Sequence, residues 1–219
     1  MSVIRVSNIK YRTDFYDIIS HRNIKIALEI GVEFGYNARD ILNHIPQIEM
    51  LYLVDPFDGS LTKKRWWKED RLFNQCKKNL DPVSKRVNYI RKKSWEAYPD
   101  IEDSSLDFIH IDGAHHIHGV ITDIITWWPK VKEGCVFSGH DYYSKSKKRN
   151  VLPVVNWIFK DRDIFCTNEF SRENGNSPSW WVIKKGELNF NKDILNQKRI
   201  HIPIEFFYAE EIYKEIYKF

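Results

Sequence analysis

The stretch from Leu106 to Tyr142 constrains the fold of this chain more than any other. An apolar run ends on Asp112, a segment of helical period follows, and a second apolar run ends on His140 and Asp141. Strand, helix and strand in this order predict two parallel strands of one sheet, joined by a crossover helix. Because the carboxyl ends of parallel strands meet at one edge, we expect these acids and imidazoles to lie together there.

The same alternation extends along most of the chain. Strands are expected over residues 24–30, 50–54, 86–90, 106–111, 135–137, 164–168 and 180–184. Helices are expected over residues 13–21, with Thr13 as N-cap, and over 37–45, 66–80 and 151–160. Strands and helices that alternate at roughly 25-residue spacing indicate βαβ units in a parallel sheet.

Composition narrows the class of protein. The 219 residues are 42% hydrophobic and 29% charged, and the net charge of +4 suits an anionic ligand without requiring nucleic acid. The three cysteines, Cys76, Cys135 and Cys166, are odd in number and widely spaced, which is typical of free thiols in a reducing compartment. Residues 1–12 lack the apolar core of a signal peptide, and no apolar segment is long enough to span a bilayer. We therefore expect a cytoplasmic protein.

The last part of the chain differs from the rest. We expect residues 1–186 to form the catalytic domain and residues 187–219 to form a C-terminal extension. Helical spacing places apolar side chains on one side of its end, namely Phe206, Ile212, Tyr213, Ile216, Tyr217 and Phe219. Such a face docks either on its own domain or on a partner subunit of a homo-oligomer.

A glycine-containing loop follows the first long strand. Gly31 and Gly35 leave room for backbone amides to approach a ligand, although a purely structural turn would have the same sequence. Asp55 ends the next strand about twenty residues later, where a carboxylate can accept both hydroxyl groups of a ribose. Glu29, an acid inside the strand, suits an amino-acid cation better than a pyrophosphate. An adenosine end and an amino-acid end together indicate S-adenosylmethionine.

Four segments then carry a resemblance to a known family. EIGVEFG, LVDPF, IDGAHHIHGV and GHDY resemble class I S-adenosylmethionine-dependent methyltransferases, and more narrowly their branch of sugar and small-molecule O-methyltransferases of the macrolide and aminocoumarin type. The similarity covers residues 24–184. It implies a Rossmann-like, doubly wound α/β fold, with a mostly parallel seven-stranded sheet and helices on both faces.

The resemblance also implies roles for particular residues. Glu29, Gly31 and Gly35 would line the methionine end of the cofactor, and Asp55 would bind the ribose. Ser94 and Trp95, which follow the third strand, would lie near the adenine. Asp112 would line the same pocket.

The acids and imidazoles of the opening stretch are the candidate catalytic residues. Two convergent carboxylates, Asp112 and Asp141, repel each other unless a cation lies between them. In the resembling enzymes a divalent ion, usually magnesium, binds there. His140 stands where that family commonly has an acid, which weakens the case for magnesium and leaves manganese, iron or no metal open. His115 is the candidate general base.

The other polar residues of the stretch have structural explanations. His116 and His118 are interpreted as solvated or hydrogen-bonding side chains, and His110 as a core histidine. Asp123 either braces a neighbouring histidine or is a surface acid. A zinc site is not expected, because no cysteine lies close in sequence to His115.

Three functions compete at this point. The first is an O-methyltransferase that acts on a small hydroxylated acceptor, such as an anionic or nucleotide-linked sugar, with Thr62–Lys68 as a lid and Ser144–Asn150 near the pocket mouth. The second is an RNA ribose methyltransferase, which the mild net charge argues against. The third is a relative that binds a metal at the cluster without transferring methyl groups.

Overall fold

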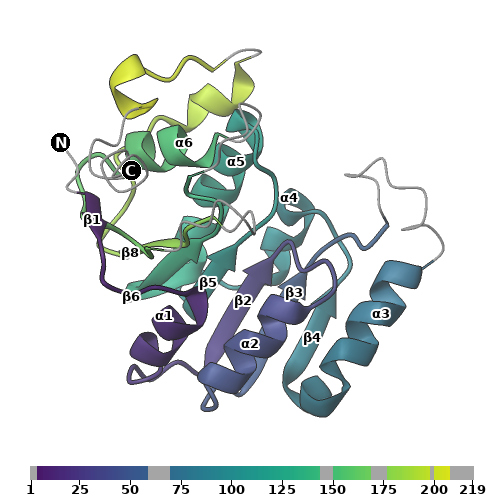
Figure 1. The fold of residues 1–219 in the computed structure, drawn as a ribbon. Coiled ribbons are helices and arrows are strands. Elements are labelled where there is room, and N and C mark those ends of the chain that lie inside the picture. The colour runs from purple at the N-terminus through teal and green to yellow at the C-terminus, as the bar shows by residue number, and fades with distance from the viewer. Residues whose placement is uncertain (1–3, 59–69, 144–149, 169–176, 198–199, 208–219) are drawn as a thin grey trace.

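The computed structural model of the protein describes residues 4–58, 70–143, 150–168, 177–197 and 200–207. These residues form one eight-stranded sheet between two layers of helices (Figure 1). The strands lie in the order β1-β7-β8-β6-β5-β2-β3-β4. Every neighbouring pair is parallel except the two pairs that β8 makes with β6 and β7.

The central strands are buried on both faces. The strands are β1 Ile4–Val6, β2 Ile26–Ile30, β3 Met50–Val54, β4 Val87–Ile90, β5 Leu106–Ile111, β6 Val131–Gly139, β7 Ile164–Cys166 and β8 Trp180–Ile183. All six residues of β5 are buried, as are four of the five in β2. Their nearly continuous apolar sequences match this position, because a strand covered on both faces has no solvent side to keep polar.

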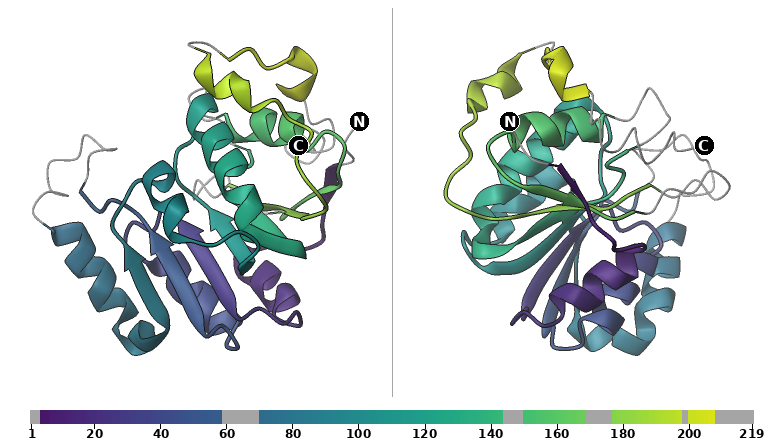
Figure 2. Two further views of the ribbon diagram at one scale, coloured as in Figure 1. Left: turned by 180° about the vertical axis from the view of Figure 1, so that it is seen from behind. Right: turned by 60° about the vertical axis from the view of Figure 1, so that its left-hand side comes forward.

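Helices cover both faces of the sheet (Figures 1 and 2). The α-helices are α1 Arg12–Ile19, α2 Tyr36–His44, α3 Arg71–Leu80, α4 Ser94–Ala97, α5 Ile117–Trp127 and α6 Val151–Ile158. Short 3-10 helices are η2 Asp81–Arg86, η3 Tyr98–Asp100, η4 Trp128–Lys130, η5 Lys192–Asn196 and η6 Ile204–Phe207. Apolar side chains of α1, α2 and α3 form the core on one face, and those of α4, α5 and α6 form the core on the other.

The predicted fold class is confirmed, with two corrections. The sheet has eight strands and not seven, because the short β1 pairs in parallel with the edge strand β7. Its three residues are too few to show a periodicity in the sequence. Thr13 is not the N-cap of the first helix: the cap is Tyr11, whose backbone N–H donates to the Asp14 carboxylate at 3.0 Å. The helix expected from residue 66 is described only from Arg71, and residues 59–69, including the proposed lid, lie outside the described residues.

The C-terminal segment packs on the same side of the sheet as α5 and α6. Its apolar side chains join that core, namely Leu188, Phe190, Ile194, Leu195, Ile200 and Ile202. In Figure 2 this segment, drawn in yellow, crosses over the outer ends of α5 and α6. The domain division at residue 186 stays a prediction. The apolar face proposed for the chain end falls largely on residues 208–219, outside the described part.

Candidate active site

Two aspartates lie side by side at the carboxyl edge of the sheet. Asp112 follows β5, and its backbone N–H donates to the Ile30 carbonyl at 2.8 Å. Asp141 follows β6 and has a left-handed backbone, with φ of 54°. Because β5 and β6 are parallel and Ile111 pairs with Gly139, both carboxylates emerge at the same level. The convergence expected from the sequence is present.

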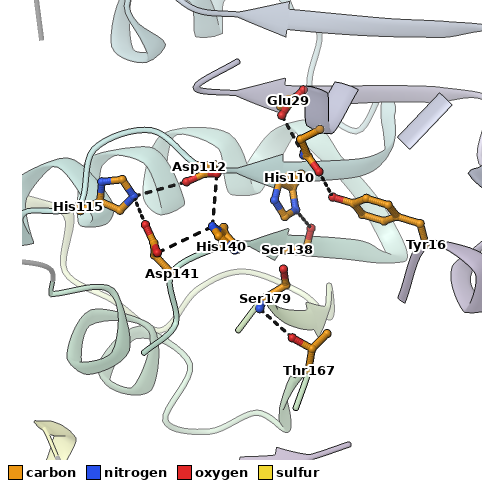
Figure 3. Close-up of polar contacts among 11 residues, drawn as sticks. Tyr16, Glu29, His110, Asp112, His115, Ser138, His140, Asp141, Thr167 and Ser179 are labelled. Carbon is orange, nitrogen blue, oxygen red and sulfur yellow. Dashed lines mark hydrogen bonds and ion pairs between the residues drawn. The ribbon is translucent and has the colours of Figure 1, made fainter. Parts of the chain in front are cut away.

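Two histidines complete this cluster (Figure 3). His115 Nε2 lies 2.6 Å from Asp141 Oδ2 and 3.4 Å from Asp112 Oδ1. His140 Nδ1 lies farther away, 3.5 Å from Asp112 Oδ2 and 3.8 Å from Asp141 Oδ1. The structure therefore brings together all four residues that the sequence predicted here.

The electrostatics of the cluster follow from this pairing. Burial by itself would raise the pKa of both carboxyl groups and lower that of His115. The contacts between the imidazoles and the carboxylates outweigh burial, so the pKa of Asp112 and that of Asp141 are lowered. The same contacts raise the pKa of His115 to about 9. Without a cation in the cluster, His115 is therefore an imidazolium near neutral pH and cannot act as a base.

The arrangement also fits a divalent cation. One ligand atom from each of Asp112, His115 and Asp141 lies within 4.8 Å of the other two. His115 Nε2 is buried and meets the geometry of a hydrogen bond with neither carboxylate, despite its short distances to both. A cation would screen the carboxylates and use that nitrogen as a ligand. The sequence named His140 as the imidazole ligand, whereas His115 is the nearer one; the identity of the ligands stays a prediction.

The glycine loop adjoins the cluster, and its glycines have a packing reason. Gly31 has a φ of +80°, and a Cβ there would lie 2.1 Å from the backbone oxygen of Asp112. Gly35 has a φ of +75°, and a Cβ there would lie 2.9 Å from Cys76 Sγ. Both positions need glycine for the contact of the loop with its own protein. Their role toward a cofactor stays a prediction.

Asp55 shapes the same loop. Its Oδ2 accepts hydrogen bonds from the backbone amides of Val32 at 3.0 Å and Glu33 at 3.1 Å, and its Oδ1 accepts from Phe57 at 2.7 Å. Burial raises the pKa of this carboxyl against the lowering effect of those amides. Asp55 thus ties the end of β3 to the glycine loop. A ribose would meet a carboxylate that already has three backbone partners.

Glu29 is buried beneath the loop, with 1% of its surface exposed. Its Oε1 accepts from Asn37 Nδ2 at 2.8 Å, and Asn37 Oδ1 accepts from the Tyr16 hydroxyl at 2.8 Å (Figure 3). Its Oε2 has no hydrogen-bond partner among the residues that the structure describes. Burial raises the pKa of Glu29 to about 8. A buried oxygen of this kind is what a binder of an ammonium group would offer. Sequence reasoning missed the hydrogen bonds of Asn37 and Tyr16 that support Glu29.

The interpretation of His110 as a histidine of the core with satisfied hydrogen bonds is half correct. The side chain is fully buried on β5, and its Nδ1 lies 3.0 Å from Ser138 Oγ. Within the described part of the chain, its Nε2 has no hydrogen-bond partner. His116, interpreted as a bystander, caps α5, because its Nδ1 accepts from the Gly119 amide at 3.1 Å.

Ser94 and Trp95 open α4, which packs on the face of the sheet that α5 and α6 cover. Trp95 is 47% exposed, and Ser94 donates a hydrogen bond to the Asp123 carboxylate. Asp123 is 2% exposed, so it is not a surface acid. Sequence reasoning left its role open. A signal was present, since Asp123 is a charged residue between the apolar neighbours of a core helix.

A small recess lies next to the cluster, between α5, α6 and the ends of β5 and β6. Its lining combines polar and apolar side chains and consists of Ile111, Asp112, Gly113, Ala114, His115, Val120, Ile124, His140, Val151 and Trp180.

Among the helices that the structure describes, none is both long enough and apolar enough to cross a membrane.

Comparison with known proteins agrees with this architecture. The protein-family model described as a methyltransferase domain matches residues 28–142. An uncharacterized protein of Sinorhizobium fredii is 29% identical over 185 residues, which is 82% of this chain and 20% of that protein. The chain thus spans about a fifth of the length of that curated relative.

Two solved structures illustrate the shared fold. The O-methyltransferase TomG of Streptomyces achromogenes, involved in tomaymycin synthesis and solved with S-adenosylmethionine, superposes with a TM-score of 0.58 at 14% identity, over 80% of this chain and 79% of TomG. Spermidine synthase of Thermotoga maritima gives 0.53 at 13% identity, over 91% and 70%. At such identities the likeness establishes the fold and leaves the acceptor open.

Proposed function

Because the chain belongs to the methyltransferase-domain family, we propose that it transfers the methyl group of S-adenosylmethionine to a hydroxyl group of a small acceptor, and that this acceptor is a sugar or glycoside. The observation that supports the proposal is the cluster of Asp112, His115 and Asp141 at the carboxyl edge, next to the glycine loop. An alkyl transfer to a hydroxyl group needs the hydroxyl proton to be removed. The cluster supplies groups that can position and accept it.

The cofactor would lie across the loop after β2. Glu29 has an unpartnered buried oxygen for the ammonium of its methionine part. Asp55 would bind the ribose hydroxyls, and Ser94 and Trp95 would lie at the adenine. TomG, which shares the fold, was solved with S-adenosylmethionine.

A divalent cation, magnesium or manganese, would be held by Asp112, Asp141 and an imidazole. When bound, it would lower the pKa of an acceptor hydroxyl as a Lewis acid. The residues of the chain then have distinct tasks. The two aspartates fix the position of the acceptor oxygen, and the imidazole that is not a ligand accepts its proton. His115 and His140 are the two candidates, since each has a ring nitrogen facing both carboxylates.

Titration calorimetry with S-adenosylhomocysteine, with and without a chelator, tests the cofactor and the cation separately. Binding at tens of micromolar or tighter is expected. No binding in that range would refute the methyltransferase assignment, whereas binding and turnover indifferent to chelator would remove only the cation.

A transfer assay tests the acceptor class. Labelled S-adenosylmethionine is incubated with the enzyme and with nucleotide-linked sugars, glycosides or single-stranded RNA. Label transferred to a sugar hydroxyl supports the proposal. Label found on RNA alone would replace it with the ribose methyltransferase considered above.

A further inference from the structure

One buried carboxylate near the site has no place in the scheme above. Asp123 lies on the inner side of α5, between Ile121 and Ile124, which are fully buried. Burial raises the pKa of Asp123 to about 7, against the lowering effect of its hydrogen bonds. Burying a carboxyl group in such apolar surroundings costs free energy unless hydrogen bonds compensate for the lost solvation.

Asp123 contacts two separate turns. Its Oδ1 accepts a hydrogen bond from the hydroxyl of Ser94, the first residue of α4. The backbone amide of Ala114 faces the carboxylate closely enough to lower its pKa. Asp123 Oδ2 lies 3.2 Å from where a Cβ on Gly113 would stand, so a glycine at this position gives the carboxylate room.

Both turns carry residues of the proposed site. Ser94 begins the turn after β4, on the adenine side. Ala114 lies between Asp112, which lines the cofactor pocket, and His115, which faces both carboxylates. Helices α4 and α5 pack against each other, so the link is short. The Asp123 side chain, on the core helix α5, therefore supports both the turn on the proposed cofactor side and the turn that carries the cluster.

We propose that Asp123 is a positioning residue, which holds the Ser94 hydroxyl and the turn from Asp112 to His115 in the arrangement that binds the cofactor. The inference rests on the proposed function, because it takes S-adenosylmethionine or its product as the ligand. Asp123 itself does not touch the ligand and acts through Ser94 and the Ala114 amide.

Asp123→Asn is the variant that tests it. An amide has one acceptor oxygen where the carboxylate has two, so it cannot serve both Ser94 and Ala114, and its NH2 group faces a donor. Isothermal titration should therefore show S-adenosylhomocysteine binding at least about tenfold more weakly than to the wild type.

Asp107→Asn is the matched control. Asp107 is also buried, and its carboxylate also accepts backbone amides, from Lys25 and Ile26, but it lies at the amino end of β5. Asp107→Asn should lower the unfolding temperature and leave the affinity for S-adenosylhomocysteine within about twofold of the wild type. Equal affinities in Asp123→Asn and Asp107→Asn would reduce Asp123 to a structural residue and overturn the inference.

If Asp123→Asn does not fold, Ser94→Ala provides a second test of the inference. The variant removes the donor and leaves the Ala114 amide facing Asp123. It should weaken binding by several-fold. Where Asp123→Asn folds, the double variant with Ser94→Ala should be less than additive, because both changes break the same hydrogen bond. Full additivity, or unchanged binding in Ser94→Ala, would overturn the inference while the proposed function stands. No binding of S-adenosylhomocysteine to the wild type would overturn both.

Discussion

Strand β5 carries an aspartate near each end, and the two carboxylates have opposite surroundings. At the amino end, Asp107 Oδ2 accepts from the Lys25 and Ile26 amides at 2.8 and 2.9 Å, and its Oδ1 accepts from Lys132 Nζ at 2.6 Å. At the carboxyl end, Asp112 faces two imidazoles at 3.4 and 3.5 Å, beside a second carboxylate. The first aspartate is fully paired, while the second belongs to a group with capacity left for a ligand.

This contrast extends to the rest of each edge. Within the described residues, Glu29 Oε2 near the carboxyl edge is buried without a hydrogen-bond partner, and His115 Nε2 is buried in ion pairs with the carboxylates but without hydrogen-bond geometry. Buried polar groups are normally paired, because an unpaired one costs about 1–3 kcal/mol. The difference between the two ends of β5 therefore separates residues that stabilise the fold from residues held ready for binding. Four substitutions test this separation.

The largest effect is expected at the amino end. Asp107→Ala leaves two buried amides and Lys132 without their acceptor, so the free energy of unfolding should fall by about 3–4 kcal/mol in urea titrations. The lowered pKa of Asp107 means that its contribution is present above its ordinary value of 3.8 and is lost as pH falls through and below that value. The loss caused by the variant should therefore shrink in acid.

Lys132→Ala is the control for this first prediction. It removes the more exposed partner and keeps both backbone bonds, so it should cost less than about 1 kcal/mol. A cost equal to that of Asp107→Ala would show that the ion pair, and not the backbone amides, carries the stability.

The opposite result is expected at the carboxyl end. Asp112→Ala should weaken Mn²⁺ binding by about 100-fold in calorimetry, because the proposed site loses one of its two charged ligands. The unfolding temperature should fall less than in Asp107→Ala, because the loss of the His115 and His140 contacts that lower the pKa of Asp112 is partly offset by the end of its repulsion with Asp141. A variant as unstable as Asp107→Ala would erase the distinction between the two ends.

The pH dependence of stability at Glu29 provides a further test of this comparison. Its pKa is raised from an ordinary 4.5 to about 8, so its neutral form favours the folded state. This contribution is complete below pH 4.5 and is lost as pH rises toward 8 and beyond. Glu29→Gln should remove this slope, about 3–4 kcal/mol between pH 5 and 8, in urea titrations at several pH values. Parallel curves for variant and wild type would show that Glu29 is charged in the folded protein.

The smallest effect is expected at His140. His140 Nδ1 lies at least 3.5 Å from either carboxylate, whereas His115 Nε2 comes within 2.6 Å of one. His140→Ala should therefore weaken Mn²⁺ binding by no more than about threefold, and His115→Ala by about tenfold or more. The reverse order would make His140 the ligand and return His115 to the role of base.

The sequence was sufficient for the order of the strands from β2 to β8 and for the convergence of Asp112 and Asp141. Met50–Val54 occupies its predicted bounds, and the buried strands β2 and β5 follow their continuous apolar runs. Asp112 and Asp141 converge because both follow parallel neighbouring strands, a consequence of topology that needs no side-chain detail. Such features depend on local periodicity and on chain connectivity, which a sequence contains.

Only the tertiary structure decided which groups meet. Sequence reasoning made His115 the base and His140 the ligand, but it could not rank their distances to the carboxylates. These distances follow from the turn before α5 and the left-handed backbone at Asp141. Asp123 is buried because α5 packs against α4 and places it under Ala114. Asp55 serves the glycine loop because the two strand ends lie side by side. Periodicity cannot specify these contacts, because each one depends on distances between segments far apart in the chain.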